Sequence, residues 1–236
     1  MQIETTDYLL SLYHEAQSKL STTQLYNKRK HLIECYQAGQ NASSTKELPE
    51  TILCYCNAIE DIYFIRAIHA LNLETLNKAT YYFERCLSKN PLDILSYLLL
   101  SDTLLKLQRP YQTINILQKA LSLNLQHPRI QNTLGIAYRA VGKQALAEKQ
   151  FLIALEKKPS FTSAMTNLVS LYIELHQYHK AINLLKKRLF IANDKTFTMK
   201  KIGQCYLLAN QLPKAIFWYR LAKSRAKSKA QLTLVK

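Results

Sequence analysis

The sequence predicts an all-α protein built from a pair of helices that recurs every 34 residues. Gly occurs 4 times and Pro 6 times among 236 residues, and strand-and-turn folds usually need more of both at their turns. Apolar residues return at the three- and four-residue spacing of amphipathic helices. Small and bulky apolar residues also return at a fixed step of 34, which indicates a repeat array.

The repeat is visible as columns, each column being a set of residues 34 positions apart. Small side chains predominate in three columns, with Arg188 as the main exception: Ala67, Ser101, Gly135, Val169 and Gly203; Ala79, Thr113, Ala147, Ala181 and Ala215; Cys86, Ala120, Ala154, Arg188 and Ala222. A bulky column holds Phe83, Leu117, Phe151, Leu185 and Tyr219. Two antiparallel helices approach closely only where small residues occupy the crossing, and the bulky side chains fill the space beside it.

The unit at 128–161 carries the pattern most completely, with Leu134, Gly135, Tyr138, Gly142, Ala147, Phe151, Ala154 and Pro159. It resembles the tetratricopeptide repeat, although Gln131 stands where that pattern begins with an aromatic residue. The resemblance implies a right-handed α-solenoid of about five helix-turn-helix repeats with an N-terminal helical extension. Its units are 60–93, 94–127, 128–161, 162–195 and 196–229.

Each repeat is expected to break between its two helices. The breaks fall at Glu74, at 108–110, and at Gly142, His176 and Asn210. At Arg188 the fourth unit must open, or the long side chain must extend toward solvent. After residue 229 no capping helix is visible, so self-association through the uncapped C-terminal repeat is one expected interaction.

The N-terminal 59 residues do not follow the 34-residue step. Residues 1–37 are predicted to form a helical hairpin or a degenerate capping repeat, and 38–48 a linker. The array then occupies 49–236. Two alternatives stay open for the first segment: it caps the array, or it docks elsewhere across the groove.

No pattern of catalytic, metal-binding or cofactor-binding residues is present, so the sequence predicts a protein that is not an enzyme and needs no cofactor. A single residue lies between Cys54 and Cys56, which is not a common zinc or redox spacing. His176 and His179 lie at a predicted turn without further ligands nearby. Five cysteines without a framework are expected as reduced thiols. With neither a membrane-length apolar run nor a secretory leader, the prediction is a cytoplasmic protein.

The resemblance also implies where a partner binds, because in this family the first helix of each unit lines the concave groove. Residue by residue, the implied partner-binding groove contains Phe64, Ile68, Leu71, Leu95, Leu98, Asp102, Leu105, Arg129, Asn132, Ile136 and Arg139. The apolar part is either an exposed interaction site or core covered by residues 1–59. The carboxylate clamp that binds chaperone C-termini is not formed, since only Asn167 and Lys201 fit it.

Positive charge is concentrated in the second half of the chain. Residues 128–236 hold 20 basic and 4 acidic side chains, whereas the first 127 residues are nearly neutral. The predicted basic patch consists of Lys186, Lys187, Arg188, Lys195, Lys200 and Lys201. This asymmetry indicates an acidic partner or a solvated face.

The leading hypothesis is therefore a protein-binding adaptor, scaffold or chaperone-like module that holds a peptide or helix, acidic or amphipathic, in its groove. Compact chains made mostly of such repeats resemble bacterial proteins that assemble secretion or pilus machines. The alternative is a nucleic-acid-associated regulatory protein that binds through its basic C-terminal half. Few aromatic residues interleave the lysines, which gives base stacking little support.

Overall fold

The structure is a computed structural model of the chain, and it describes residues 27, 30, 33, 59–191 and 194–234. Asn27, Lys30 and Ile33 are helical. Otherwise the predicted N-terminal hairpin, the 38–48 linker and the first ten residues of the array lie outside the described residues.

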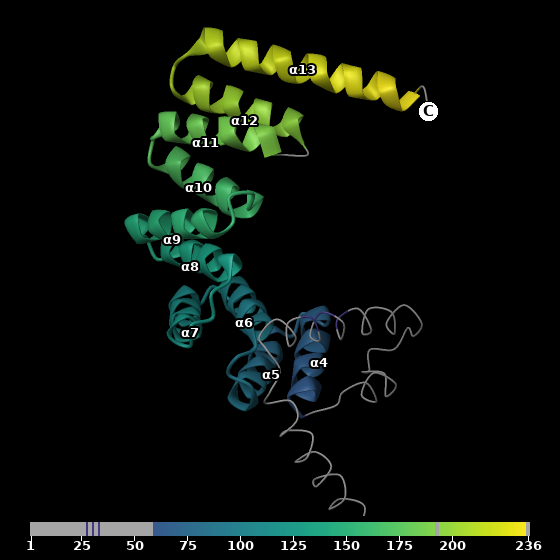
Figure 1. The fold of residues 1–236 in the computed structure, drawn as a ribbon, viewed down its shortest axis with the longest axis vertical. Coiled ribbons are helices and arrows are strands. Elements are labelled where there is room, and N and C mark those ends of the chain that lie inside the picture. The colour runs from purple at the N-terminus through teal and green to yellow at the C-terminus, as the bar shows by residue number, and fades with distance from the viewer. Residues whose placement is uncertain (1–26, 28–29, 31–32, 34–58, 192–193, 235–236) are drawn as a thin grey trace, which may run out of the picture. The chain divides into compact units, whose positions relative to one another are not determined.

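The chain divides into two compact units, which meet in the sequence between His127 and Pro128. The helices of the first unit are α4 (Ile59–Asn72), α5 (Leu76–Lys89), α6 (Ile94–Lys106) and α7 (Pro110–Ser122). They form two antiparallel hairpins, α4 with α5 and α6 with α7, and α5 packs against α6 (Figure 1). The division falls at the predicted boundary between the second and third repeats.

The second unit contains α8 (Pro128–Ala140), α9 (Gln144–Lys157), α10 (Thr162–Glu174), α11 (Tyr178–Ile191), α12 (Lys195–Leu208) and α13 (Leu212–Leu234). These helices form three hairpins in chain order. Between hairpins, α10 packs against α9 and also contacts α8, and α12 packs against α11. The fold is thus the predicted all-α solenoid of helical hairpins, and within the described ranges every regular element is a helix.

Turns inside the five hairpins share one backbone conformation. Glu74, Gln108, Gly142, His176 and Asn210 all have positive φ, between 56° and 76°. In the third repeat the Gly142 amide donates to the Arg139 carbonyl at 3.0 Å, and the Lys143 amide donates to the Tyr138 carbonyl at 2.9 Å. This pair of bonds is the Schellman motif, in which a left-handed residue ends a helix and satisfies its last carbonyls. The predicted breaks are confirmed at each of these residues.

Small residues do allow the two helices of a hairpin to cross closely. A Cβ atom added to Gly135 of α8 would lie 2.6 Å from Cε1 of Phe151 on α9, well inside van der Waals contact. At the equivalent Gly203 of α12, the added atom would lie 3.2 Å from the ring of Tyr219 on α13. The ring of the bulky column therefore rests on the backbone of the first helix, as the two columns predict.

Helix α6 has a buried cap that the sequence analysis did not identify. The Asp93 carboxylate accepts the backbone amides of Leu95 and Ser96 at 3.1 and 3.2 Å, and the Ser96 hydroxyl at 2.7 Å. Cys86 of α5 lies beside the same group, with its Sγ 3.6 Å from the carboxylate. Asp93 is fully buried, so these bonds replace the water that the charge loses.

The Gly135 crossing predicts a large effect from a small substitution. We expect Gly135→Leu to lower the free energy of unfolding by roughly 3 kcal/mol or more, because the new side chain overlaps the buried Phe151 ring. Gly203→Ala, with more room and a partly exposed Tyr219, should cost less than Gly135→Ala. Urea unfolding followed by circular dichroism at 222 nm measures all three. Equal costs for the two alanine variants would contradict the crossing geometry.

The turn conformation predicts a stabilising substitution. A non-glycine residue with positive φ is strained by roughly 1–2 kcal/mol. Gln108→Gly should therefore raise the urea midpoint, although the added freedom of Gly in the unfolded chain offsets part of the gain. Gln108→Ala is the control and should not stabilise, since Ala carries the same Cβ strain. Conversely, Gly142→Ala should destabilise, although no atom lies within 4 Å of the new Cβ.

Candidate functional site

The residues predicted to line the groove occupy four columns of the first helices, and the structure separates these columns by exposure. Phe64, Leu98 and Asn132 share one column and are buried, at 0%, 0% and 5% relative exposure. Leu95 is buried as well, whereas Arg129 in the same column is partly exposed. Phe64, Leu95 and Leu98 are therefore buried in the structure, which agrees with the alternative that the apolar wall is core.

The physical reason is visible at Asn132. Its side-chain oxygen accepts a hydrogen bond from the Asn167 amide at 2.9 Å, and Asn167 lies on α10, the next first helix. On α8 this column therefore faces the neighbouring first helix, whereas its later members Thr166 and Lys200 are exposed. Phe64 is covered within its own hairpin, where its ring meets Phe83 of α5 edge-on at 6.1 Å.

The other two columns stay partly open. Along one column, Ile68 is buried like Leu95, Asp102, Ile136 and Ser170 are half-buried, and Gln204 is exposed. The second contains Leu71, Leu105, Arg139 and Ile173, all half-buried, and the exposed Leu207. These two columns, which we call the open columns, are the part of the predicted groove that a partner could reach.

Two polar contacts join α8 to α10 beside the open columns. One is the Asn132–Asn167 bond. The other is an ion pair between Arg139 and Glu174, 3.3 Å apart and about one-third and one-half exposed. A pair this exposed contributes little to stability, on the order of 0–1 kcal/mol. Together the contacts fix the relative register of the two helices, so the open columns of this unit form a pre-arranged surface.

The predicted basic patch is only partly brought together. Arg188 of α11 lies over the ring of Phe197 on α12, with its guanidinium carbon 5.7 Å from the ring centre. Lys201 approaches the same ring, with Nζ at 5.8 Å. Phe197 is 43% exposed, so this ring and its two cations lie at the surface. Lys186, Lys187 and Lys200 are exposed, and Lys195 is partly buried at the start of α12.

The structure shows how the long side chain of Arg188 fits at a position that is small in the other repeats. Its aliphatic chain leads the guanidinium out of the hairpin to the Phe197 ring, as a snorkelling side chain does. Its Nε atom stays buried without a hydrogen-bond partner. The hairpin therefore tolerates a large residue at the position that Ala154 and Ala222 fill elsewhere, at the cost of one unsatisfied donor.

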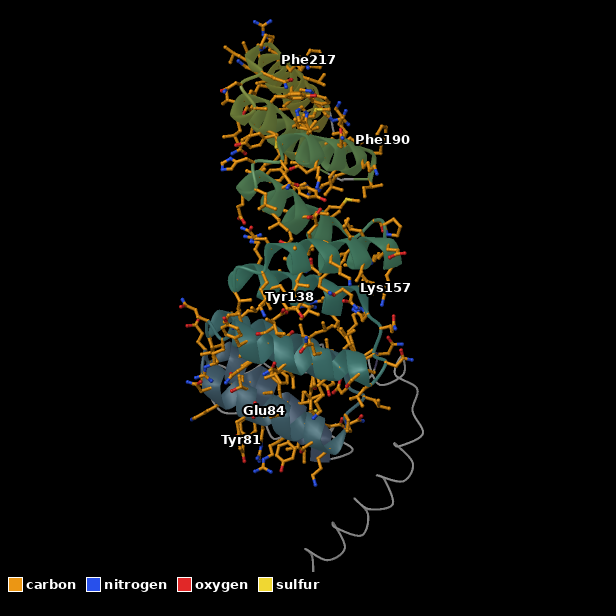
Figure 2. All side chains as sticks on the ribbon, turned by 90° about the vertical axis from the view of Figure 1, so that its left-hand side faces the viewer. Tyr81, Glu84, Tyr138, Lys157, Phe190 and Phe217 are labelled. Carbon is orange, nitrogen blue, oxygen red and sulfur yellow. The ribbon has the colours of Figure 1, made fainter. Side chains whose placement is uncertain are left out.

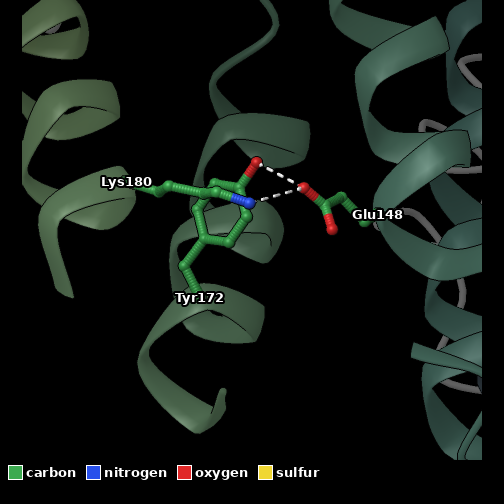
Figure 3. A network of polar contacts seen from close by, with 3 residues as sticks. All are labelled: Glu148, Tyr172 and Lys180. Atoms are coloured by element: carbon green, nitrogen blue, oxygen red, sulfur yellow. Dashed lines mark hydrogen bonds and ion pairs between the residues drawn. The ribbon is translucent and has the colours of Figure 1, made fainter. Parts of the chain in front are cut away.

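A polar network that sequence reasoning missed joins α9, α10 and α11 (Figure 3). The Tyr172 hydroxyl donates to Glu148 at 2.9 Å, and Lys180 Nζ lies 3.6 Å from the same carboxylate oxygen. Lys180 also lies over the Tyr172 ring, 5.3 Å from its centre. The available signal was the column of Thr80, Ile114, Glu148, Ile182 and Ile216, in which Glu148 is the one charged residue.

Surface hollows occur elsewhere, on the first unit. One, with a volume of about 380 Å³, lies between α4 and α5 and is lined by residues that include Arg66, His69 and Tyr82. Another, of about 310 Å³, is lined by residues of α5, α6 and α7, among them Glu84 and Ile116. Neither includes a residue of the predicted groove.

Cys86 and Cys205 are buried cysteines that form no disulfide, and burial raises the pKa of Cys205 although nearby Lys201 opposes the shift. His176 lies at a turn and its Nδ1 is 2.8 Å from the Tyr178 hydroxyl. Across the described ranges, no three His, Cys, Asp or Glu side chains gather as metal ligands. Nor is any helix there both long and apolar enough to cross a membrane. The other three cysteines lie outside the described residues.

The network predicts a pH dependence. Burial, and then the hydrogen bond and charge of Glu148, raise the pKa of Tyr172 from 10.0 to about 12. The folded state therefore favours the neutral phenol, and its contribution to stability is complete below pH 10 and lost as the pH rises toward 12. In Tyr172→Phe the free energy of unfolding should fall less over this range. Glu148→Gln should lower the Tyr172 pKa, which difference absorbance at 295 nm against Tyr172→Phe measures. An unchanged pKa would contradict the assigned network.

Comparison with known proteins adds information on the fold. No protein-family model matches the chain, and no curated protein matches it either. Solved structures of MamA proteins are similar. One has a TM-score of 0.65 at 19% identity and covers 73% of this chain and 94% of its own. Another, MamA from residue 41 onward from Desulfovibrio magneticus RS-1, has a TM-score of 0.62 at 15% identity and covers 72% and 96%. At such identities the likeness extends to the fold, so the chain shares the all-helical repeat architecture of these structures.

Proposed function

We propose that this chain is a tetratricopeptide-type adaptor that holds a peptide or helix of a partner protein against its first helices. The observation that carries the proposal is the pair of open columns. Half-buried residues of mixed polarity follow one another along successive first helices, as Ile136 and Ser170 do on α8 and α10. Such a surface offers apolar contact and hydrogen-bonding groups along a line, which suits an extended or helical segment.

Each unit presents its own part of this surface. In the second unit the register contacts between α8 and α10 reduce the ordering cost of binding. In the first unit the open columns contain Leu71, Asp102 and Leu105. The recognised residues are therefore fewer than the sequence predicts, because Phe64, Leu95 and Leu98 support the helices from inside.

A part in assembling a larger machine, such as a secretion or pilus apparatus, remains within the proposal. It rests on architecture alone.

The alternative of nucleic-acid binding has one observation in its favour. Phe197 is exposed between Arg188 and Lys201, and an aromatic ring flanked by cations can stack on a base while the cations meet phosphates. One such ring is a small platform, since binding of single strands uses several aromatic residues along a charged groove. We therefore rank this function second.

A blocking variant tests the adaptor function. We expect Ile136→Glu with Ser170→Glu to weaken capture of the native partner by about tenfold or more, because two charges replace contacts along the open column. The matched control, Leu152→Glu with Asn183→Glu, places the same charges on exposed positions of α9 and α11. Partners isolated from the native cell with nuclease present, and then bound as pure proteins, supply the measurement. Equal binding by both variants would rule out the open columns.

Binding of the same partner also distinguishes the adaptor function from nucleic-acid binding when basic residues are replaced. A variant with Lys186, Lys187, Lys200 and Lys201 changed to Gln should keep the protein partner at physiological salt and mainly slow its association. Loss of binding to every anionic polymer and to the native partner together, with a flattened salt dependence, would favour the nucleic-acid function instead.

A further inference from the structure

Contacts between successive repeats identify which columns face the next repeat. Glu148 of α9 bonds Tyr172 of α10. Asn132 of α8 bonds Asn167 of α10, and Arg139 of α8 pairs with Glu174 of α10. Each contact runs from one hairpin to the first helix of the following hairpin. The following helix therefore meets these columns, although the Arg139 column stays half-exposed along the array.

In the last hairpin the Arg139 and Glu148 columns are more exposed than in the preceding repeats, whereas the Asn132 column is already exposed at Thr166 of α10. A step of 68 residues leads from Asn132 to Lys200, from Arg139 to Leu207 and from Glu148 to Ile216. Leu207 is 48% exposed and Ile216 is 41% exposed, whereas Ile114 and Ile182 in the Ile216 column are 7% and 3% exposed.

Two more residues of α13 complete this face. Tyr219 rests on Gly203 with one side of its ring, yet it is 39% exposed, while Phe83, Leu117, Phe151 and Leu185 in its column are at most 1% exposed. Lys223 is exposed in a column that holds Leu87, Leu121, Leu155 and Leu189 in the earlier repeats. We call Lys200, Leu207, Ile216, Tyr219 and Lys223 the terminal face.

Exposure by itself does not define this face, because other apolar residues of α13 stand in columns that are exposed in every repeat. Phe217, labelled in Figure 2, is 60% exposed. Its column holds Tyr81, Asn115, Lys149 and Asn183, which are all exposed. Phe217 is thus an ordinary surface residue, whereas Ile216 beside it occupies a packing position. The neighbouring pair provides a matched control.

We propose that the terminal face docks an acidic amphipathic helix of another protein. A helix is expected because α10 and α12 cover the corresponding faces of α9 and α11. Leu207, Ile216 and Tyr219 provide an apolar centre for its apolar stripe. This docking site shares Leu207 with the open columns, but Ile216 and Tyr219 of α13 lie outside them, and the proposal does not depend on the function proposed for the open columns.

Charge selects the occupant. No acidic residue follows Asp194, whereas ten Lys and Arg residues do. Lys200 stands in a column that holds Phe64, Leu98, Asn132 and Thr166 in the earlier repeats, and Lys223 stands in a column of leucines. Both are exposed, so the terminal face carries two positive charges beside its apolar residues in the sequence. An acidic helix neutralises them at the edge of the interface. A second copy docked through the same face would instead oppose lysine with lysine, and juxtaposed like charges disfavour that arrangement.

The test uses the full chain and a designed probe. The probe is a fluorescein-labelled 18-residue helical peptide with Leu on one face and Glu elsewhere, and its counterpart carries Lys in place of Glu. Anisotropy should show binding of the Glu peptide and not of the Lys peptide. Ile216→Gln should weaken binding about tenfold or more, and Phe217→Gln less than about twofold. Lys200→Gln with Lys223→Gln should weaken it and flatten the salt dependence.

Additional variants separate the outcomes. Leu207→Gln is a second test of the face if Ile216→Gln alters helicity, and Ile136→Gln, which lies in the open columns, should leave peptide binding unchanged. Equal losses at Ile216 and Phe217, equal binding of both peptides, or loss through Ile136→Gln alone would overturn the proposal. So would a dimer in sedimentation equilibrium that Ile216→Gln, and not Phe217→Gln, dissociates. A photo-crosslinker at position 216 that reacts only with residues 1–58 of its own chain would also overturn it.

Discussion

The close crossing of first and second helices in each hairpin is the constraint on which the rest of the structure depends. At Gly135 the Phe151 ring lies so close that no side chain fits between them. The crossing fixes the distance and rotation of the two helices, and close-packed interiors transmit such constraints. Rotation in turn decides which columns face the partner helix, the next repeat or solvent. Burial of the polar Asn132 side chain, at 5% exposure, follows from this geometry and not from its polarity.

Periodicity predicted the fold well because it records this constraint directly. A small residue at each crossing, a bulky residue beside it and a break between the helices all have local physical causes, so they repeat at the step of 34. Even the turn residue could be located to one position, although only Gly142 among the five is the residue that the left-handed conformation favours. The loop after α7 could not be anticipated. There Asn124 also has positive φ, and the division between the two units follows within a few residues.

The candidate site was less predictable. Periodicity locates a column, but it does not show whether the side chains of that column face the partner helix, the next repeat or solvent. Phe64 and Leu98 were expected on the groove wall by family resemblance, yet they share the column in which Asn132 bonds the neighbouring helix. The change from Phe64 and Leu98 to the amide of Asn132 within one column was the available sign of a specific contact. Glu148 gave the same sign and was overlooked, because its partner Tyr172 lies 24 residues away in the next repeat. Contacts across repeats become visible only when residues are compared between columns.

Comparison along one column also explains why a residue inside the array and the equivalent residue in the last hairpin have different roles. Inside the array the following hairpin covers the side chains of a column, as it covers Ile182. These side chains then contribute only packing. At the last hairpin the following helix is missing from the described chain, and Ile216 keeps the apolar side chain of a packing position. If this face met only water, we would expect polar residues at positions 216 and 219 as well, just as Lys223 stands where the earlier repeats have leucine. A lysine at the edge together with apolar residues at the centre is instead the composition of an interface core with a charged rim.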